Sequence, residues 1–295
     1  MPISTNDYTA LYGYCMANMY NGATIAASSR VQIEGLVFKY DTVISLRRQL
    51  FTRHVQKTTY QHRNRHAIRV YRERWERGEH IASIARSMRY SPYLLARILI
   101  EDICQVRPVS KLIHAPEKIE NERLRVELDD CIEGDPDFSP FVDRIRQRIG
   151  LEYEYVLCQK LKARCLPFET EGDLRRKGMA KTPDVLLTLP IGCRRPDTGQ
   201  WQPVHWIDSK AMFGDPDTFQ EEHRKQMDGY INRFGPGMVI YWFDYAESIA
   251  SLSKDVLIQE DFPGEILLPH GEMAKPDFDF SALTRDKMML PLQQR

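Results

Sequence analysis

VHWIDSKA, residues 204–211, is the stretch of sequence that decides the fold. Its first half is an apolar run typical of a buried strand, and Asp208 and Lys210 place two opposite charges at its end. Side chains two positions apart on a strand point to the same face of the sheet. Because an unpaired charge moved out of water costs several kcal/mol, Asp208 and Lys210 must neutralise each other or share a site with another charged group.

A second charged residue stands upstream, in KTPDVLL, residues 181–187. Asp184 begins another apolar run there, so two neighbouring strands can bring it within a few ångströms of Asp208. Two carboxylates that close repel each other unless a cation lies between them, and oxygen ligands suit Mg²⁺ or Mn²⁺. Lys210 can then hold or polarise the attacking water. The two stretches together predict a metal-dependent site for hydrolysis.

The elements around these motifs predict a mixed α/β domain. Strands are expected at residues 166–170, 183–190, 203–210 and 237–243. A short helix is expected at residues 138–150, an amphipathic helix at 151–165 and a further helix at about 217–235. The last strand is reached through a helix, which is how a chain returns to a sheet in parallel.

The pairs Pro183-Asp184 and Asp208-Ser209-Lys210 resemble the PD-(D/E)XK nuclease superfamily, whose fold is a restriction-endonuclease-like mixed sheet flanked by helices. The resemblance implies Asp184, Asp208 and the carbonyl oxygen of Ser209 as ligands of one or two Mg²⁺ ions. It also implies a glutamate on the preceding helix and a Gln-x-x-x-Tyr signature on the following one.

Residues that match these two further features are present in the chain. The glutamate is Glu152 or Glu154, and we favour Glu154 because it shares a helical face with Leu157 and Leu161. The signature is matched by Gln226 and Tyr230, four positions apart on one helical face.

The match extends to a smaller family within that superfamily. KTPDVLL, HWIDSKA and NRFGPGMVIYW together resemble the TPD-motif family over residues 149–243, and YSPYLLARILIE resembles its N-terminal part. The resemblance implies a Mg²⁺-dependent nuclease fold behind N-terminal helix-turn-helix units. It also implies codanin as a partner, a protein linked to histone supply and red-cell maturation.

The net charge of zero hides a basic segment. Residues 47–97 contain thirteen Lys or Arg and three Glu, an excess of ten positive charges. Such a segment is typical of proteins that bind nucleic acid; the alternative is a solvated, Arg-rich helix face. Lys181, just before the second strand, is a further candidate for phosphate contact.

Within the basic segment, residues 81–103 resemble a helix-turn-helix. Two apolar helical stripes flank Ser91-Pro92, and Ser is a good N-cap and Pro a good first helical residue. Two short helices joined by a tight turn form the DNA-binding motif, although ordinary helical hairpins show the same pattern. Arg86, Arg89 and Arg97 decorate the pair and are its candidate nucleic-acid contacts.

Composition sets the remaining expectations. The chain has 295 residues, with 42% hydrophobic and 28% charged residues, as in globular proteins. No apolar run approaches the ~20 residues of a membrane helix, and the N-terminus lacks a secretory pattern. Six scattered cysteines fit reduced thiols of the cytosol or nucleus rather than a zinc site. The nucleus is the expected compartment, with the cytoplasm as alternative, and the oligomeric state is open.

Four segments are expected: a poorly patterned N-terminus (1–30), an all-α basic domain with the helix-turn-helix (31–107), a helical connector (108–148) and the nuclease-like domain (149–295). The expected function is metal-dependent hydrolysis of nucleic acid, with DNA, including structured or branched DNA, as the expected substrate. The alternative is a nuclease fold with weak or no activity that serves as a DNA- or protein-binding adaptor of codanin. A helix-turn-helix transcription factor would leave Asp184, Asp208 and Lys210 unexplained.

Overall fold

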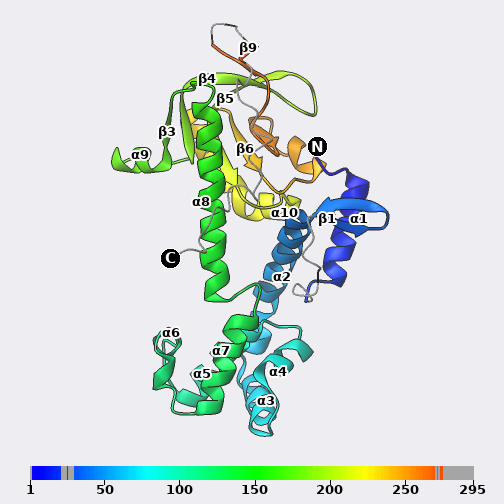
Figure 1. The fold of residues 1–295 in the computed structure, drawn as a ribbon, viewed down its shortest axis with the longest axis vertical. Coiled ribbons are helices and arrows are strands. Elements are labelled where there is room, and N and C mark those ends of the chain that lie inside the picture. Colours follow the sequence, from blue (N-terminus) through cyan, green and yellow to red (C-terminus); the bar gives the residue numbers. More distant parts are fainter. Residues whose placement is uncertain (1, 21–24, 26–29, 270, 272, 275–295) are drawn as a thin grey trace, which may run out of the picture. The chain divides into compact units, whose positions relative to one another are not determined.

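The computed structural model of the chain describes residues 2–20, 25, 30–269, 271, 273 and 274. The chain divides into two compact units (Figure 1). The first contains Met1–Tyr8 and Gly150–Arg295, and the second contains Thr9–Ile149. None of the described helices is both long enough and apolar enough to cross a membrane.

The first unit is built on a mixed sheet, as the sequence predicts. Its strands are β3 (Phe168–Thr170), β4 (Val185–Arg194), β5 (Trp201–Lys210), β6 (Gly237–Tyr241), β7 (Val256–Gln259), β8 (Ile266–Leu267) and β9 (Met273–Ala274). The order is β7-β6-β5-β4-β8-β9, with β3 paired to β4. β4 runs antiparallel to β3, β5 and β8, while β5, β6 and β7 run parallel. The four expected strands are therefore confirmed, and β7, β8 and β9 were not predicted.

The helices of this unit differ from expectation in two places. The helices expected at 138–150 and 151–165 form one helix, α8 (Pro140–Lys162), because a glycine such as Gly150 costs a helix only about 1 kcal/mol and does not end it. The helix expected at 217–235 contains a π-helical turn, η3 (Phe219–His223), between α10 (Pro216–Thr218) and α11 (Arg224–Phe234). The shorter elements are α9 (Glu171–Arg176) and η4 (Glu247–Ser251).

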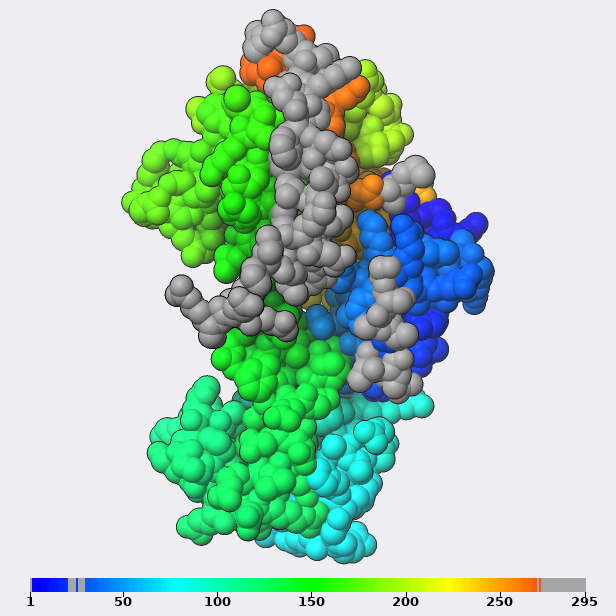
Figure 2. Space-filling view, in the orientation of Figure 1, coloured from blue at the N-terminus to red at the C-terminus, as the bar shows by residue number. Residues whose placement is uncertain are grey.

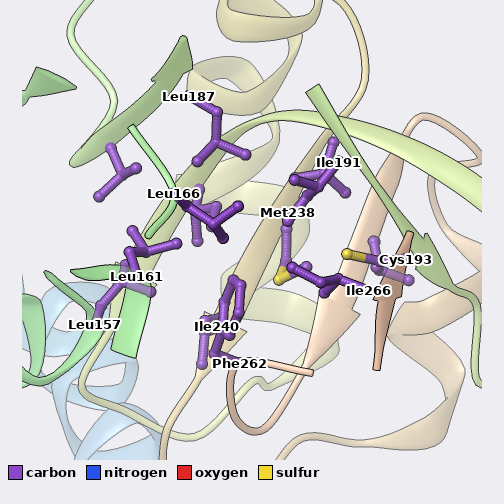
Figure 3. Packing of buried hydrophobic residues seen from close by; sticks show 14 residues of the cluster. Leu157, Leu161, Leu166, Leu187, Ile191, Cys193, Met238, Ile240, Phe262 and Ile266 are labelled. Atoms are coloured by element: carbon purple, nitrogen blue, oxygen red, sulfur yellow. The ribbon is translucent and has the colours of Figure 1, made fainter. Parts of the chain in front are cut away.

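Apolar side chains cover both faces of the sheet. On one face, Leu157 and Leu161 of α8 pack in a cluster with strand residues such as Met238 and Ile240, and Figure 3 shows these side chains gathered against the strands. On the other face, Met227 and Tyr230 of α11 pack in a second cluster with Trp206 of β5. These two layers hold the ends of β4 and β5, where the charged residues lie, between α8 and α11.

The second unit is mostly helical. It contains most of α1 (Thr5–Ala17) and all of α2 (Tyr40–His62), α3 (Arg65–Glu76), α4 (Ile81–Ser87), α5 (Pro92–Cys104), α6 (Ser110–Ile113), η2 (Pro116–Lys118) and α7 (Glu122–Gly134). The helix α1 lies where no pattern was recognised. A hairpin, β1 (Arg30–Ile33) and β2 (Leu36–Lys39), replaces the start of the helical region expected from residue 31. Glu34 and Gly35 both have positive φ. The tight turn of a two-residue hairpin requires this conformation at both of its central residues.

Candidate active site

Two carboxylates face each other at the ends of β4 and β5. Val185 pairs with Ile207 in the antiparallel register, so Asp184 stands opposite Asp208 at the next position. The backbone N–H of Ser209 donates a hydrogen bond of 2.7 Å to Oδ2 of Asp184. The predicted approach of Asp184 and Asp208 is therefore confirmed, and strand pairing is its cause.

Burial makes this acid pair costly for the fold. Asp208 is only 1% exposed, and burial raises the pKa of its carboxyl group. Burial, followed by the charge of Asp208, raises the pKa of Asp184 to about 8. Both carboxyls therefore hold their protons more tightly than exposed ones, and a bound cation would offset the cost of ionising them.

Lys210 is the nearest cation to this pair. Its Nζ lies 2.6 Å from Oδ2 of Asp208. Burial alone would lower the pKa of Lys210, but the surrounding carboxylates, Asp208 first among them, outweigh burial and raise it. Lys210 is therefore an ammonium group, suited to stabilising negative charge rather than to accepting a proton.

A chain of hydrogen bonds orients this ammonium group. Nζ of Lys210 donates to Oε1 of Gln226 at 3.2 Å, and the amide nitrogen of Gln226 donates to the Tyr230 hydroxyl at 2.8 Å. The Tyr230 hydroxyl donates in turn to the carbonyl oxygen of Thr182 at 3.2 Å. Gln226 and Tyr230 thus share one face of α11, as predicted, and they connect Lys210 to the loop that carries Asp184.

Glu154 lies beside the acid pair, on α8. It lines a cavity of about 290 Å³ together with Asp184 and Glu171, and Glu152 does not line it. Burial, followed by the charges of Glu171 and Asp208, raises the pKa of Glu154. Of the two glutamates left open by the sequence, Glu154 is the one that faces this site.

Glu171 is a site residue that the sequence reasoning missed. Its N–H donates to the carbonyl oxygen of Asp184 at 3.1 Å, and its Oε1 accepts a hydrogen bond of 3.2 Å from the Thr182 hydroxyl. It occupies the first position of α9, where Thr170 and Asp173 form a capping box. That Thr-x-x-Asp spacing was the available signal for a helix start beside the first strand.

The oxygen donors of this site fit a hard divalent cation in type. Oδ2 of Asp208 is buried and receives no hydrogen bond, although Lys210 lies beside it as an ion-pair partner. Within the described ranges, no three His, Cys, Asp or Glu side chains lie close enough together to hold a metal ion. Because Mg²⁺ keeps several waters and needs only one or two carboxylates, the Asp184–Asp208 pair is a sufficient protein contribution.

Lys181 lies on the α11 side of the same site. Its side chain passes close to Gly229 of α11. A Cβ atom added to Gly229 would lie 3.0 Å from Nζ of Lys181. Gly229 precedes Tyr230 on α11, so the exposed ammonium group is close to the residues that orient Lys210. Its expected contact with phosphate stays a prediction.

The helix pair proposed as a DNA-binding unit is present as α4 and α5. Ser91 caps α5 as predicted, since its hydroxyl oxygen accepts a hydrogen bond of 3.1 Å from the N–H of Leu94. None of the thirteen described residues of α5 is fully exposed, and six of them are buried. Because a recognition helix needs an open face to enter a groove, DNA contact through α5 stays a prediction.

The three arginines proposed as nucleic-acid contacts lie in different surroundings. Arg86 is exposed. The guanidinium of Arg89 lies 5.5 Å from the ring centre of Tyr20, and that of Arg97 lies 5.7 Å from the ring centre of Tyr93. Arg89 is exposed as well, whereas Arg97 is half-buried, so Arg97 is the least accessible of the three to a phosphate.

Folding also pairs part of the basic segment with acids, of which Glu101, Asp102 and Asp137 come from outside that segment. Arg47 is 1% exposed and forms a buried ion pair with Asp137. Further ion pairs join Arg48 to Asp137, Arg63 to Glu101, Arg69 to Glu73, Arg72 to Glu76 and Asp102, and Arg74 to Glu79. The positive surface is consequently smaller than the excess of ten charges in the sequence indicates.

Known proteins are similar to this chain over most of its length. A family model described as "Protein of unknown function TPD sequence-motif" matches residues 120–262. The chain is 33% identical over 241 residues to CDAN1-interacting nuclease 1 of Danio rerio, covering 76% of this chain and 78% of the relative. It is 32% and 31% identical over 242 residues to the proteins of that name from Mus musculus and Homo sapiens, covering 77% of this chain and 84% of each relative.

The comparison with solved structures found no match. The family model and the sequence relatives therefore carry the assignment, through a similarity that runs over most of the chain. The chain belongs to the TPD sequence-motif family, together with the vertebrate CDAN1-interacting nuclease 1 proteins.

Proposed function

We propose that this chain is a metal-dependent nuclease of the PD-(D/E)XK type that hydrolyses phosphodiester bonds, with DNA as the expected substrate. The observation that carries the proposal is the pair of half-buried Asp184, just before β4, and buried Asp208 on β5, which stand opposite each other, with the Lys210 ammonium 2.6 Å from Asp208. The names of the vertebrate relatives support it, since they are called nucleases.

Each site residue has a role in this proposal. Asp184 and Asp208, with the carbonyl oxygen of Ser209, would hold one or two Mg²⁺ or Mn²⁺ ions, and Glu154 would contribute through a water of the ion's shell. Such an ion, when bound, polarises a phosphoryl oxygen and lowers the pKa of water. Lys210 remains protonated and stabilises the negative charge that develops on the phosphate.

The residues on α11 act on Lys210 rather than on the substrate. Gln226 accepts a hydrogen bond from Nζ of Lys210, and Tyr230 fixes the Gln226 amide by accepting from its nitrogen. An ammonium held in this way loses little further freedom when the phosphate charge develops, which is the condition for electrostatic catalysis. Gln226 and Tyr230 are therefore positioning residues.

Cleavage of labelled DNA tests the proposal. Single strands, duplexes, flaps and four-way junctions are incubated with Mg²⁺, Mn²⁺ or EDTA, and the variants Asp208→Asn and Lys210→Ala run in parallel. We expect cutting only with the metal, and a loss of at least about 100-fold in each variant. Glu154→Gln should lose activity as well, whereas Glu152→Gln on the same helix should keep it. Cutting that survives both EDTA and Asp208→Asn would disprove the proposal.

Binding to codanin is a second part of the proposal. The relatives are named for interaction with CDAN1, and we infer the same partner for this chain. The experiment is affinity measurement between the full chain and purified codanin, with Asp208→Asn as a control that removes a buried charge and keeps the size of the side chain.

A codanin-binding adaptor without turnover is the second candidate. It is favoured by the ion pair between Lys210 and Oδ2 of Asp208, and because no three carboxylates among the described residues lie close enough together to hold a metal ion. Codanin binding that Asp208→Asn leaves unchanged, together with no cutting of any DNA in either metal, would support the adaptor over the nuclease.

The basic segment would supply the affinity for nucleic acid in either case. Arg86, Arg89, Arg97 and Lys181 are the proposed phosphate contacts. Each contact that is removed should lower the slope of log affinity against log salt concentration by about 1. Unchanged slopes in all four Ala variants would exclude these side chains as phosphate contacts. The nucleus stays the proposed compartment.

A further inference from the structure

An apolar wall adjoins the acid pair. Leu151 and Tyr155 of α8 are 63% and 61% exposed, although both are large apolar side chains. They line the cavity of about 290 Å³ that Glu154, Glu171 and Asp184 also line. In the space-filling view, the segment of β3 and α9 that supplies Glu171 stands out beside α8 (Figure 2).

Helix geometry explains why these side chains share the cavity. Leu151 and Tyr155 are four positions apart, and Glu154 stands three positions after Leu151, so all three lie on one face of α8. The turn of helix that presents Glu154 to Asp184 thus also presents Leu151 and Tyr155. This part of the helix face is open, whereas Leu157 and Leu161 are buried against the sheet.

The chemistry of the cavity selects one kind of occupant. The carboxyl groups of Glu154, Glu171 and Asp184 offer no positive charge to an anionic group that arrives without a cation, whereas a neutral aromatic ring can pack on Tyr155. Bases stack on such exposed aromatic side chains in proteins that bind single strands. A volume of about 290 Å³ lies at the lower limit of ligand pockets, which suits a single nucleotide.

We propose that Leu151 and Tyr155 form a subsite for the base of the nucleotide beside the scissile phosphate. The proposal rests on the proposed nuclease function and adds a substrate class to it. A base inside a duplex is stacked on both sides and cannot reach Tyr155 without leaving the stack. The preferred substrate therefore has an unpaired nucleotide at the cut, as in a single strand, a flap or a frayed end.

Binding measurements with modified flaps test this subsite. Ca²⁺ replaces Mg²⁺ to support binding, and each position near the junction carries in turn a normal base, 2-aminopurine or an abasic sugar. For the wild-type chain we expect one position at which loss of the base weakens binding by about 5- to 100-fold. At that position, the fluorescence of 2-aminopurine should be quenched on binding.

Variants of Leu151 and Tyr155 then show whether these side chains cause the weaker binding of the abasic flap. Tyr155→Ala should bind the normal flap as weakly as the wild type binds the abasic one, and it should no longer respond to loss of the base. Tyr155→Phe should keep the response, and Leu151→Ala should weaken it. Leu189→Ala, at an equally exposed leucine of β4 outside the cavity, is the matched control and should change nothing.

The outcomes separate the subsite from the nuclease function. If the wild type cuts DNA but Tyr155→Ala responds to loss of the base as the wild type does, the subsite is refuted and the nuclease function stands. If the wild type neither binds nor cuts any flap, both proposals fail. Loss of codanin binding in Tyr155→Ala with unchanged DNA binding would show instead that the wall is a protein-docking face.

Discussion

The acid pair should make the stability of the metal-free protein depend on pH. Burial and the charge of Asp208 raise the pKa of Asp184 to about 8, from an ordinary value near 4 in the unfolded chain. Between these values the folded state holds a proton that the unfolded state has released. The stabilisation that this proton provides is complete below about pH 4 and is lost as the pH rises through about 8.

The size of the effect follows from linkage. One proton held only by the folded state changes the free energy of unfolding by about 1.4 kcal/mol per pH unit. Since the proton dissociates near pH 8, the loss between about pH 6.5 and 8.5 is about 2 kcal/mol. That corresponds to a fall of about 4–8 °C in the melting temperature of a unit of this size.

The assay is thermal unfolding in EDTA at the two pH values. Asp184→Asn carries no titrating carboxyl at this position, so its melting temperature should fall by about 4–8 °C less than that of the wild type over this interval. Asp228→Asn, at an exposed carboxylate of α11, is the control and should behave like the wild type. Burial lowers the pKa of His54, His62 and His223, and their contribution is common to the wild type and Asp184→Asn, so it cancels in the comparison.

The stabilisation of the protein by Mg²⁺ at the two pH values tests the protonation of the acid pair independently. A cation at the pair compensates the ionised carboxylates, so it should stabilise the protein more at about pH 8.5 than at 6.5. If the wild type and Asp184→Asn lose the same stability as the pH rises, Asp184 does not carry a proton there. The account of the buried acid pair would then be wrong.

Three further predictions concern stability and assembly of the site. Gly237→Ala should unfold the first unit, because the added Cβ would overlap the buried indole of Trp206; a loss above about 3 kcal/mol in urea unfolding is expected. Arg47→Ala should cost the second unit about 3 kcal/mol, since Asp137 remains buried without its main partner; equal stability would refute a buried ion pair. Thr182→Val should lower kcat, while Thr182→Ser, which keeps the hydroxyl donor, should retain it; equal rates would exclude the hydroxyl contact from catalysis.

The sequence predicts the sheet of the first unit and the ends at which the site forms. β6 is a continuous apolar run, and β4 and β5 contain shorter apolar runs bounded by proline or charge, which is the signal of a buried strand. The charges of Asp184 and Asp208 stand out against those runs. Short strands such as β8, with two residues, carry too little periodicity to be recognised.

Other features depend on contacts between distant parts of the chain and escape local reasoning. The Tyr8 hydroxyl donates to Oδ1 of Asp215 at 2.6 Å, across 207 positions, and ties the N-terminal segment to the first unit. Arg47 forms a buried ion pair with Asp137, which is 90 positions away in the sequence. An arginine of the basic segment is therefore part of the interior of the second unit. A count of charges along the chain cannot distinguish such an arginine from an exposed one such as Arg86.

The loop of the TPD motif shows why three consecutive residues belong together at this site. The Thr182 hydroxyl donates to Glu171 and its carbonyl oxygen accepts from Tyr230, so α9 and α11 hold the same residue from two sides. Pro183 is buried and favours an extended Thr182 before it, which keeps the hydroxyl and the carbonyl directed to these different helices. Asp184 then enters β4 opposite Asp208. The motif is thus the junction at which the acid pair and the residues that orient Lys210 are held in one arrangement.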